Sequence, residues 1–242
     1  MDLNKFQSEG VNIYIDSETI SGPEEEFIQE FLDNFKLSEM PEEGKLTKAQ
    51  KSFLDMPGVK NSAEIILITV RVNGINICLS CMKNDLTQEA MMLKTCEIEG
   101  FSIDHDLVFD DEKGMLIGLH DLCDELGPIN IAYSWNGPGF DYAKIRLRCG
   151  RYDIDPPHFV RYQTETKLFD VQKYYSYNCT SYKITGYYAL KRACNDLDLD
   201  SGKMGCGSEV QGMYETGRYG ELKPYGMKDA ILLEQIAQRL RV

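Results

Sequence analysis

Five side chains suited to holding or directing a divalent cation lie in three widely separated parts of the chain. Asp16 and Glu18 stand two residues apart after an apolar run, Asp141 follows a Gly-rich turn, and Tyr225 and Asp229 stand four apart. Residues two apart share one face of a strand, and residues four apart share one face of a helix. Grouped carboxylates repel one another unless a cation joins them, and their hard oxygens suit Mg²⁺ or Mn²⁺. If the chain brings these segments together, they predict a site for divalent ions.

Each segment by itself also has an ordinary structural interpretation. Asp16 and Glu18 fit a solvated pair at a strand end, and Asp141 fits an acidic residue that complements a helix dipole. Tyr225 fits a half-buried aromatic residue, with Asp229 a solvated charge nearby. The chemistry therefore depends on whether the fold makes the three segments converge.

The elements that must position these residues are predicted from apolar periodicity. Alternating apolar residues predict a strand over Val11–Asp16. Two further β-rich runs, Ile65–Val72 and Ile75–Leu79, are joined by Asn73-Gly74, a strong hairpin signal. The remaining predicted elements are strands at Ile129–Ser134 and 167–171, helices at 24–35, 48–54, 85–97, 110–126, 140–149, 184–195 and 225–240, and a Gly-rich loop at 200–222.

This order of elements predicts an α/β fold. A strand and a hairpin come first, and strands alternating with helices follow. An antiparallel meander followed by parallel crossovers gives a mixed five-stranded sheet flanked by helices. In that architecture Asp16 and Glu18 stand at a strand end that faces a crevice, where α/β sheets usually place their sites.

Composition narrows the class of protein. The chain has 242 residues, 43% of them hydrophobic and 27% charged, which is typical of a globular protein. Its net charge of −13 disfavours broad phosphate neutralisation of duplex nucleic acid. No apolar stretch approaches the roughly 18–20 residues of a membrane helix, and no signal peptide is visible, so we expect a cytoplasmic protein with its cysteines mostly reduced. Eight cysteines with a single C-x-x-C pair, Cys78 and Cys81, favour packing over a zinc or redox site.

We expect residues 1–242 to form a single domain, with residues 20–62 as an acidic, helical insertion after the first strand. The insertion looks too short and polar for a core of its own. Its Phe-rich helix is expected to be an added helix covering the sheet. A lid over the site, or a surface for a partner protein, is the competing interpretation.

Taken together, the three segments resemble the DEDD-type 3′–5′ exonucleases of the ribonuclease H-like fold. Within that group the chain looks most like the proofreading exonuclease domain of family B DNA polymerases. Y-I-D-S-E-T resembles the first family motif, Y-S-W-N-G-P-G-F-D-Y-A-K-I the second, and K-P-Y-G-M-K-D-A-I-L-L the third. A Tyr in the third motif, where other members have His, indicates the tyrosine subgroup. The resemblance covers nearly the whole chain except residues 20–62, which are longer than the usual connection.

The resemblance implies a metal-dependent 3′–5′ exonuclease that uses two Mg²⁺ or Mn²⁺ ions. Asp16 would bridge both ions, Glu18 and Asp229 would complete the shell of the first, and Asp141 would hold the second. Tyr225 would orient the attacking water rather than act as the base, since an ordinary phenol has a pKa of about 10. The expected substrate is the 3′ end of a single-stranded nucleic acid, DNA more than RNA, with an unidentified replication or repair protein as a possible partner.

Substrate contacts are predicted in and after the second motif. Asn136 and Phe140 are expected to contact the terminal nucleotide, Phe140 by stacking, although it fits a core position equally well. A basic run, Lys144 to Arg151, is interpreted as a solvated helix face in preference to a phosphate grip. The competing interpretation from another functional class is a catalytically inactive exonuclease-like module that binds nucleic acid or protein.

Overall fold

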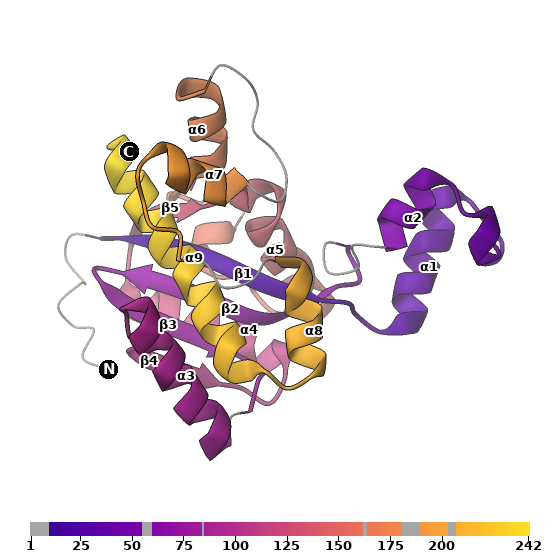
Figure 1. The fold of residues 1–242 in the computed structure, drawn as a ribbon, viewed down its shortest axis with the longest axis horizontal. Coiled ribbons are helices and arrows are strands. Elements are labelled where there is room, and N and C mark those ends of the chain that lie inside the picture. The colour runs from indigo at the N-terminus through magenta and orange to yellow at the C-terminus, as the bar shows by residue number, and fades with distance from the viewer. Residues whose placement is uncertain (1–9, 55–59, 84, 162–163, 181–188, 203–206) are drawn as a thin grey trace.

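One mixed sheet organises the computed structural model, which describes residues 10–54, 60–83, 85–161, 164–180, 189–202 and 207–242 (Figure 1). The sheet has six strands in the order β4-β3-β2-β1-β5-β6. β1 pairs antiparallel with β2 and parallel with β5, and these pairings put β1 in the middle of the sheet. The strands are β1 (Val11–Ile20), β2 (Glu64–Val72), β3 (Ile75–Ser80), β4 (His105–Val108), β5 (Ile129–Ser134) and β6 (Lys167–Asp170).

The predicted α/β class and mixed sheet are confirmed, but five strands was wrong. β1, β2 and β3 form the expected meander, and Asn73 and Gly74 both adopt positive φ at the hairpin turn. β5 and β6 then add parallel strands beside β1. The sixth strand, β4, pairs parallel with β3. Its four residues, H-D-L-V, are half-buried or exposed and do not alternate in polarity, so no periodicity marks them as a strand.

Helices cover both faces of the sheet. α9 packs on β1 and β2 and also on α3, whereas α4 and α5 pack on the opposite face. None of the described helices has both the length and the apolar character needed to cross a membrane. The helices are α1 (Glu24–Phe35), α2 (Lys48–Leu54), α3 (Leu86–Glu99), α4 (Glu112–Leu126), α5 (Asp141–Arg151), α6 (Val171–Asn178), α7 (Ala189–Asp196), α8 (Val210–Glu215) and α9 (Tyr219–Leu240), with short 3-10 turns at Glu43–Lys45, Gly137–Gly139, His158–Val160 and Gly207–Glu209.

The last helix begins six residues earlier than predicted. The prediction started it at Tyr225, after Pro224 and a Gly-rich loop, but α9 begins at Tyr219 and α8 occupies part of that loop. Tertiary contacts offset the backbone hydrogen bond that Pro224 removes. The Gly220 amide donates to Gln88 Oε1 at 2.8 Å, and buried Lys223 pairs with Asp106 at 2.8 Å. The predicted helix at 184–195 begins among residues outside the described ranges, and α7 represents its second half.

The insertion has a small core of its own, so two expectations about it were wrong. Phe27, Phe31, Phe35 and Phe53 pack ring against ring at centroid distances of 5.0–5.7 Å, and Phe31 is fully buried. α1 and α2 project from the side of the body instead of covering the sheet (Figure 1). Three Phe residues at helical spacing on α1, with Phe53 on α2, supply enough apolar surface for two short helices to pack together.

Candidate metal centre

Three of the four predicted carboxylate ligands come together at the face of the sheet that α9 covers. Asp16, Glu18 and Asp229 each offer an oxygen, and these atoms all lie within 4.8 Å of one another. We call them the carboxylate cluster. Along β1, Ile13 and Ile15 face α4 and α5, so the intervening even-numbered positions face α9. The prediction that the strand ends at Asp16 was wrong, because β1 continues to Ile20.

A close approach between α9 and the sheet fixes the third member of the cluster. A Cβ added to Gly226 would lie 2.8 Å from Leu67 Cδ2, so a larger residue here would require the Leu67 side chain to shift. The Thr69 hydroxyl donates to the Gly226 carbonyl at 3.1 Å. Tyr225 and Asp229 flank this contact and are 6% and 8% exposed. The sequence Y-G-x-x-D therefore sets both side chains against β1.

Asp141 falls outside the cluster and is held by β1 in another way. The Ser17 amide and hydroxyl donate to Asp141 Oδ1 at 3.0 and 2.6 Å. Burial raises the pKa of Asp141 to about 6, opposed by the hydrogen bonds from Ser17. Asp141 is 1% exposed and lies in the first turn of α5, as predicted, although α5 begins at Asp141 and not at Phe140.

The edge of β1 explains why Asp141 approaches from a different side. The pairing of β1 with β5 ends at Tyr14, whereas its pairing with β2 continues to Ile20. Beyond Tyr14 the Ser17 amide has no β5 partner, and the Asp141 carboxylate takes that place. Ser17 and Asp16 point to opposite faces of β1, so the residue that holds Asp141 is not on the face of the cluster.

One cavity of about 370 Å³ nevertheless joins all seven predicted site residues. Asn136 is exposed and Phe140 half-buried, and neither belongs to the hydrophobic core clusters. The cavity exposes rings and amides beside the carboxylates, a combination suited to a nucleotide. Its predicted residues are Asp16, Glu18, Asn136, Phe140, Asp141, Tyr225 and Asp229.

The turn between β5 and α5 holds Asn136 and Phe140 at the cavity. Asn136 adopts a left-handed backbone conformation with φ 67°, and its backbone amide donates to Asp170 Oδ1 at 3.2 Å. The Gly137 amide donates to Ser134 Oγ at 3.0 Å, and a Cβ on Gly137 would collide with that same hydroxyl. Asp170 has a structural role here, since its carboxylate also caps α6 through the Lys173 backbone amide.

Six further residues line the cavity: Ser17, Trp135, Gln172, Leu190, Gly207 and Leu233. Trp135 lies inside the quoted second motif but was given no role, and it is the single tryptophan of the chain. Gln172 and Leu190 come from α6 and α7. Trp135 stands directly before Asn136, and that adjacency was available as a signal, whereas nothing in the sequence links α6 or α7 to the site.

The donor set fits Mg²⁺ or Mn²⁺. The described residues that line the cavity include four carboxylates but neither histidine nor cysteine, the usual zinc ligands. The described residues that line the cavity also include neither lysine nor arginine. Hard oxygen donors under mutual repulsion favour a hard divalent cation.

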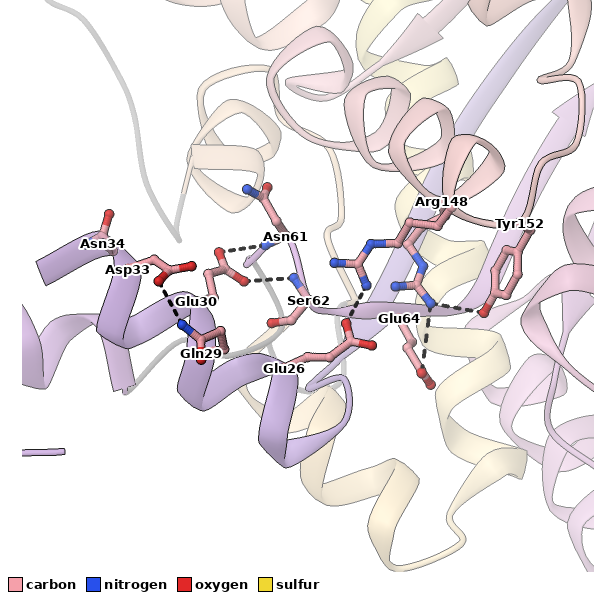
Figure 2. A pocket seen from close by; sticks show the side chains of 11 residues that line it. Glu26, Gln29, Glu30, Asp33, Asn34, Asn61, Ser62, Glu64, Arg148 and Tyr152 are labelled. Atoms are coloured by element: carbon pink, nitrogen blue, oxygen red, sulfur yellow. Dashed lines mark hydrogen bonds and ion pairs between the residues drawn. The ribbon is translucent and has the colours of Figure 1, made fainter. Parts of the chain in front are cut away.

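A larger cavity, about 960 Å³, lies elsewhere, between α1 and α5 (Figure 2). Glu30 accepts hydrogen bonds from the Asn61 and Ser62 amides at 2.9 and 2.8 Å, and Arg151 pairs with Glu26 at 2.5 Å. These contacts join the insertion to the body. The cavity shares no lining residue with the metal centre, so among the described residues nothing supports the competing interpretation of a lid.

The basic run of α5 is the predicted solvated face only in part: Arg146 and Arg151 are exposed, but Lys144 and Arg148 are not. Lys144 and Arg148 are 5% and 3% exposed. Lys144 donates to the Lys60 carbonyl, and Arg146 to the Val160 carbonyl. The partners are tertiary, not three or four residues away along the helix, so these cations serve the fold.

A scan against protein-family models and a search of curated proteins both find no match to this chain.

Proposed function

We propose that this protein is a metal-dependent 3′–5′ exonuclease of the DEDD type, tyrosine subgroup, with a ribonuclease H-like fold. The observation that carries the proposal is the carboxylate cluster, whose three oxygens lie within 4.8 Å in one cavity with Asp141 and Tyr225. The six-stranded mixed sheet is compatible with that fold. The cytosol remains its predicted compartment.

Asp16, Glu18 and Asp229 would hold one divalent ion, and Asp16 with Asp141 would hold a second. When bound, two such ions about 3.5–4 Å apart supply positive charge to the attacking and leaving oxygens of a phosphodiester. Four carboxylates without cations would repel that anionic substrate, so the reaction requires the metal.

The side chains around the carboxylates have separate tasks in this proposal. The Tyr225 hydroxyl orients the attacking water, and its 6% exposure restricts the directions that the phenol can take. Phe140 stacks on the terminal base, an interaction worth about 1–3 kcal/mol that tolerates any base. Asn136 contacts the terminal nucleotide from the rigid turn described above. Single-stranded 3′ ends fit this arrangement, with DNA favoured over RNA.

The direct test is degradation of a 5′-labelled single-stranded DNA oligonucleotide and of its RNA counterpart. Each is incubated with Mg²⁺, Mn²⁺ or EDTA, and Asp16→Ala serves as the inactive control. We expect a ladder that shortens from the 3′ end with either metal, and no products in EDTA or with Asp16→Ala. Comparing the two oligonucleotides gives the sugar preference.

The competing function, an inactive exonuclease-like binding module, predicts a different pattern. Neither oligonucleotide would be cleaved under any metal condition, and both Asp16→Ala and the unaltered protein would bind them equally. Internal cuts, or shortening from the 5′ end, would contradict both functions.

A further inference from the structure

A second hollow lies beside the metal centre, across the turn that carries Asn136. It has a volume of about 440 Å³ and is lined by residues of that turn, β6 and α6. We call it the edge hollow, because β6 is the outermost strand on that side of the sheet. The lining residues that matter here are Pro138, Phe169, Asp170, Lys173, Tyr174 and Tyr177.

Aromatic rings form the floor and rim of the edge hollow. Phe169 and Tyr174 are half-buried, with ring centroids 5.7 Å apart and planes inclined by 43°. On its other side Phe169 contacts Tyr133, which fixes its ring against the sheet at a centroid distance of 5.4 Å. Tyr177, one turn after Tyr174 on α6, is 62% exposed. An exposed tyrosine beside two ordered rings is a surface on which flat groups stack.

Two lysines give the edge hollow a positive rim on an otherwise acidic protein. Lys167 Nζ lies 5.1 Å from the centroid of the Phe169 ring, and Lys173 is exposed. Within the described ranges, neither lysine forms an ion pair with a carboxylate. In a chain of net charge −13, cations that the fold has not used are available to an anionic ligand.

The edge hollow neighbours the metal centre across one turn, although the two share no lining residue. Asn136 lines the cavity of the carboxylates, and Pro138 in the same turn lines the edge hollow. Asp170 also lines the edge hollow, and its Oδ1 accepts hydrogen bonds from the Asn136 and Lys173 backbone amides at 3.2 and 2.9 Å. A nucleic-acid strand with its 3′ end in the cavity would therefore meet these rings and lysines where it passes over the turn.

We infer that the edge hollow binds upstream nucleotides of a single-stranded nucleic acid whose 3′ end occupies the metal centre; this inference rests on the proposed function. Bases stack on Tyr177 and Tyr174, and Lys167 and Lys173 face the phosphates. Such contacts use the π-face that every base has, so they hold a strand without reading its sequence.

The experiment measures binding by the full chain, by fluorescence anisotropy, of a labelled single-stranded DNA dodecanucleotide and a labelled dinucleotide. Ca²⁺ serves as the divalent ion. Tyr177→Ala should lower the ratio of dodecanucleotide to dinucleotide affinity about fivefold or more, because one stacked base is lost. Tyr177→Phe should keep both the ring and the affinity ratio.

Lys173→Gln should reduce the slope of log affinity against log salt concentration by about 0.7 for the dodecanucleotide. Lys113→Gln, an exposed lysine on α4, is the charge control and changes neither.

The outcomes separate this inference from the proposed function. A ratio unchanged in both Tyr177→Ala and Lys173→Gln overturns the inference and favours a protein segment in the edge hollow, whatever the protein cleaves. Equal weakening of both ligands also overturns it, because the substitutions would then act on the cavity. A ratio that falls as expected, in a protein that cleaves nothing, supports the inference and contradicts the exonuclease.

Discussion

Two groups of buried carboxylates in this molecule are neutralised in opposite ways. Both carboxylate oxygens of Glu112, at the start of α4, accept hydrogen bonds from Arg148 Nε, Oε1 at 2.9 Å and Oε2 at 2.8 Å. Oε2 also accepts the Tyr152 hydroxyl at 2.8 Å, and Oε1 also accepts the Ile65 amide at 2.7 Å. The carboxylate cluster instead brings three like charges within 4.8 Å, and the described lining of its cavity includes no lysine or arginine.

The difference separates a structural carboxylate from a candidate functional one. A buried charge needs a partner, and the chain provides one for Glu112 from α5. The described lining of the cluster's cavity contains no such cation, and a divalent ion bound there would supply positive charge to all three carboxylates. Repelling carboxylates cost stability in the absence of a cation, so their convergence at one cavity is more consistent with a site than with support of the fold.

Asp229→Asn should have the largest effect on activity and almost none on stability. Several kcal/mol of transition-state stabilisation depends on the ions, so we expect turnover to fall about a thousandfold or more. In EDTA the melting temperature should stay the same or rise, because one repelling charge is gone. Turnover of a labelled oligonucleotide and thermal melting in EDTA check the two halves. A melting temperature that drops by several degrees would place Asp229 with the structural carboxylates.

Glu112→Gln should behave in the reverse sense. It leaves Arg148, 3% exposed, with only the more distant Glu64 carboxylate at 3.9 Å as an ion-pair partner, and removing one member of a buried pair typically costs about 3–5 kcal/mol of unfolding free energy. Urea unfolding measures the loss. The matched control, Glu112→Leu with Arg148→Met, should recover part of it, because apolar residues tolerate the site better than a lone charge. A control no more stable than Glu112→Gln would show that hydrogen bonds to Ile65 and Tyr152, not charge balance, dominate.

Mn²⁺ should stabilise the protein through the cluster alone. A ligand present at a hundred times its dissociation constant adds about 2.7 kcal/mol to the unfolding free energy. We expect unfolding in urea to shift by about that amount in the unaltered protein and in the Glu112→Leu, Arg148→Met control, but not in Asp229→Asn. Trp135, which lines the cavity, offers a fluorescence signal for the same titration. An equal shift in Asp229→Asn would mean that Mn²⁺ binds elsewhere.

Local signals in the sequence predicted much of the fold. Asn73-Gly74 determined the hairpin because both positions need positive φ, and the periodicity of α1, α3, α4 and α5 located those helices to within about two residues. β4 and the start of α9 depend on tertiary contacts instead. β4 is a strand because β3 offers it an edge, and Gly220 extends α9 by packing on α3. Such contacts leave no periodic pattern.

The candidate site divides along the same line. Spacing alone placed Asp16 beside Glu18 and Tyr225 near Asp229, since strand and helix periods are local properties. The convergence of the segments came from the resemblance, not from spacing. That Asp141 would be held by Ser17, one residue away from its expected neighbour Asp16, depends on where β5 stops pairing with β1. No feature of the sequence marks that position.

The smallest expected effect concerns the pH dependence of stability at Lys144, a buried cation that donates to a neutral carbonyl. Lys144 donates to the Lys60 carbonyl, and burial lowers its pKa from 10.5 to about 8. Between those two pH values the unfolded chain holds the proton and the folded chain does not, so this group makes unfolding less favourable as the pH rises. Below pH 8 both states are protonated and the cost of burial is constant. The unfolding free energy of the unaltered protein, minus that of Lys144→Met, should therefore increase from about pH 8 to 10.5, as measured by urea unfolding. A difference that stays flat across this range would mean that water reaches the Lys144 ammonium. Arg148, whose charge Glu112 compensates, would then be the one desolvated cation among the described residues of α5.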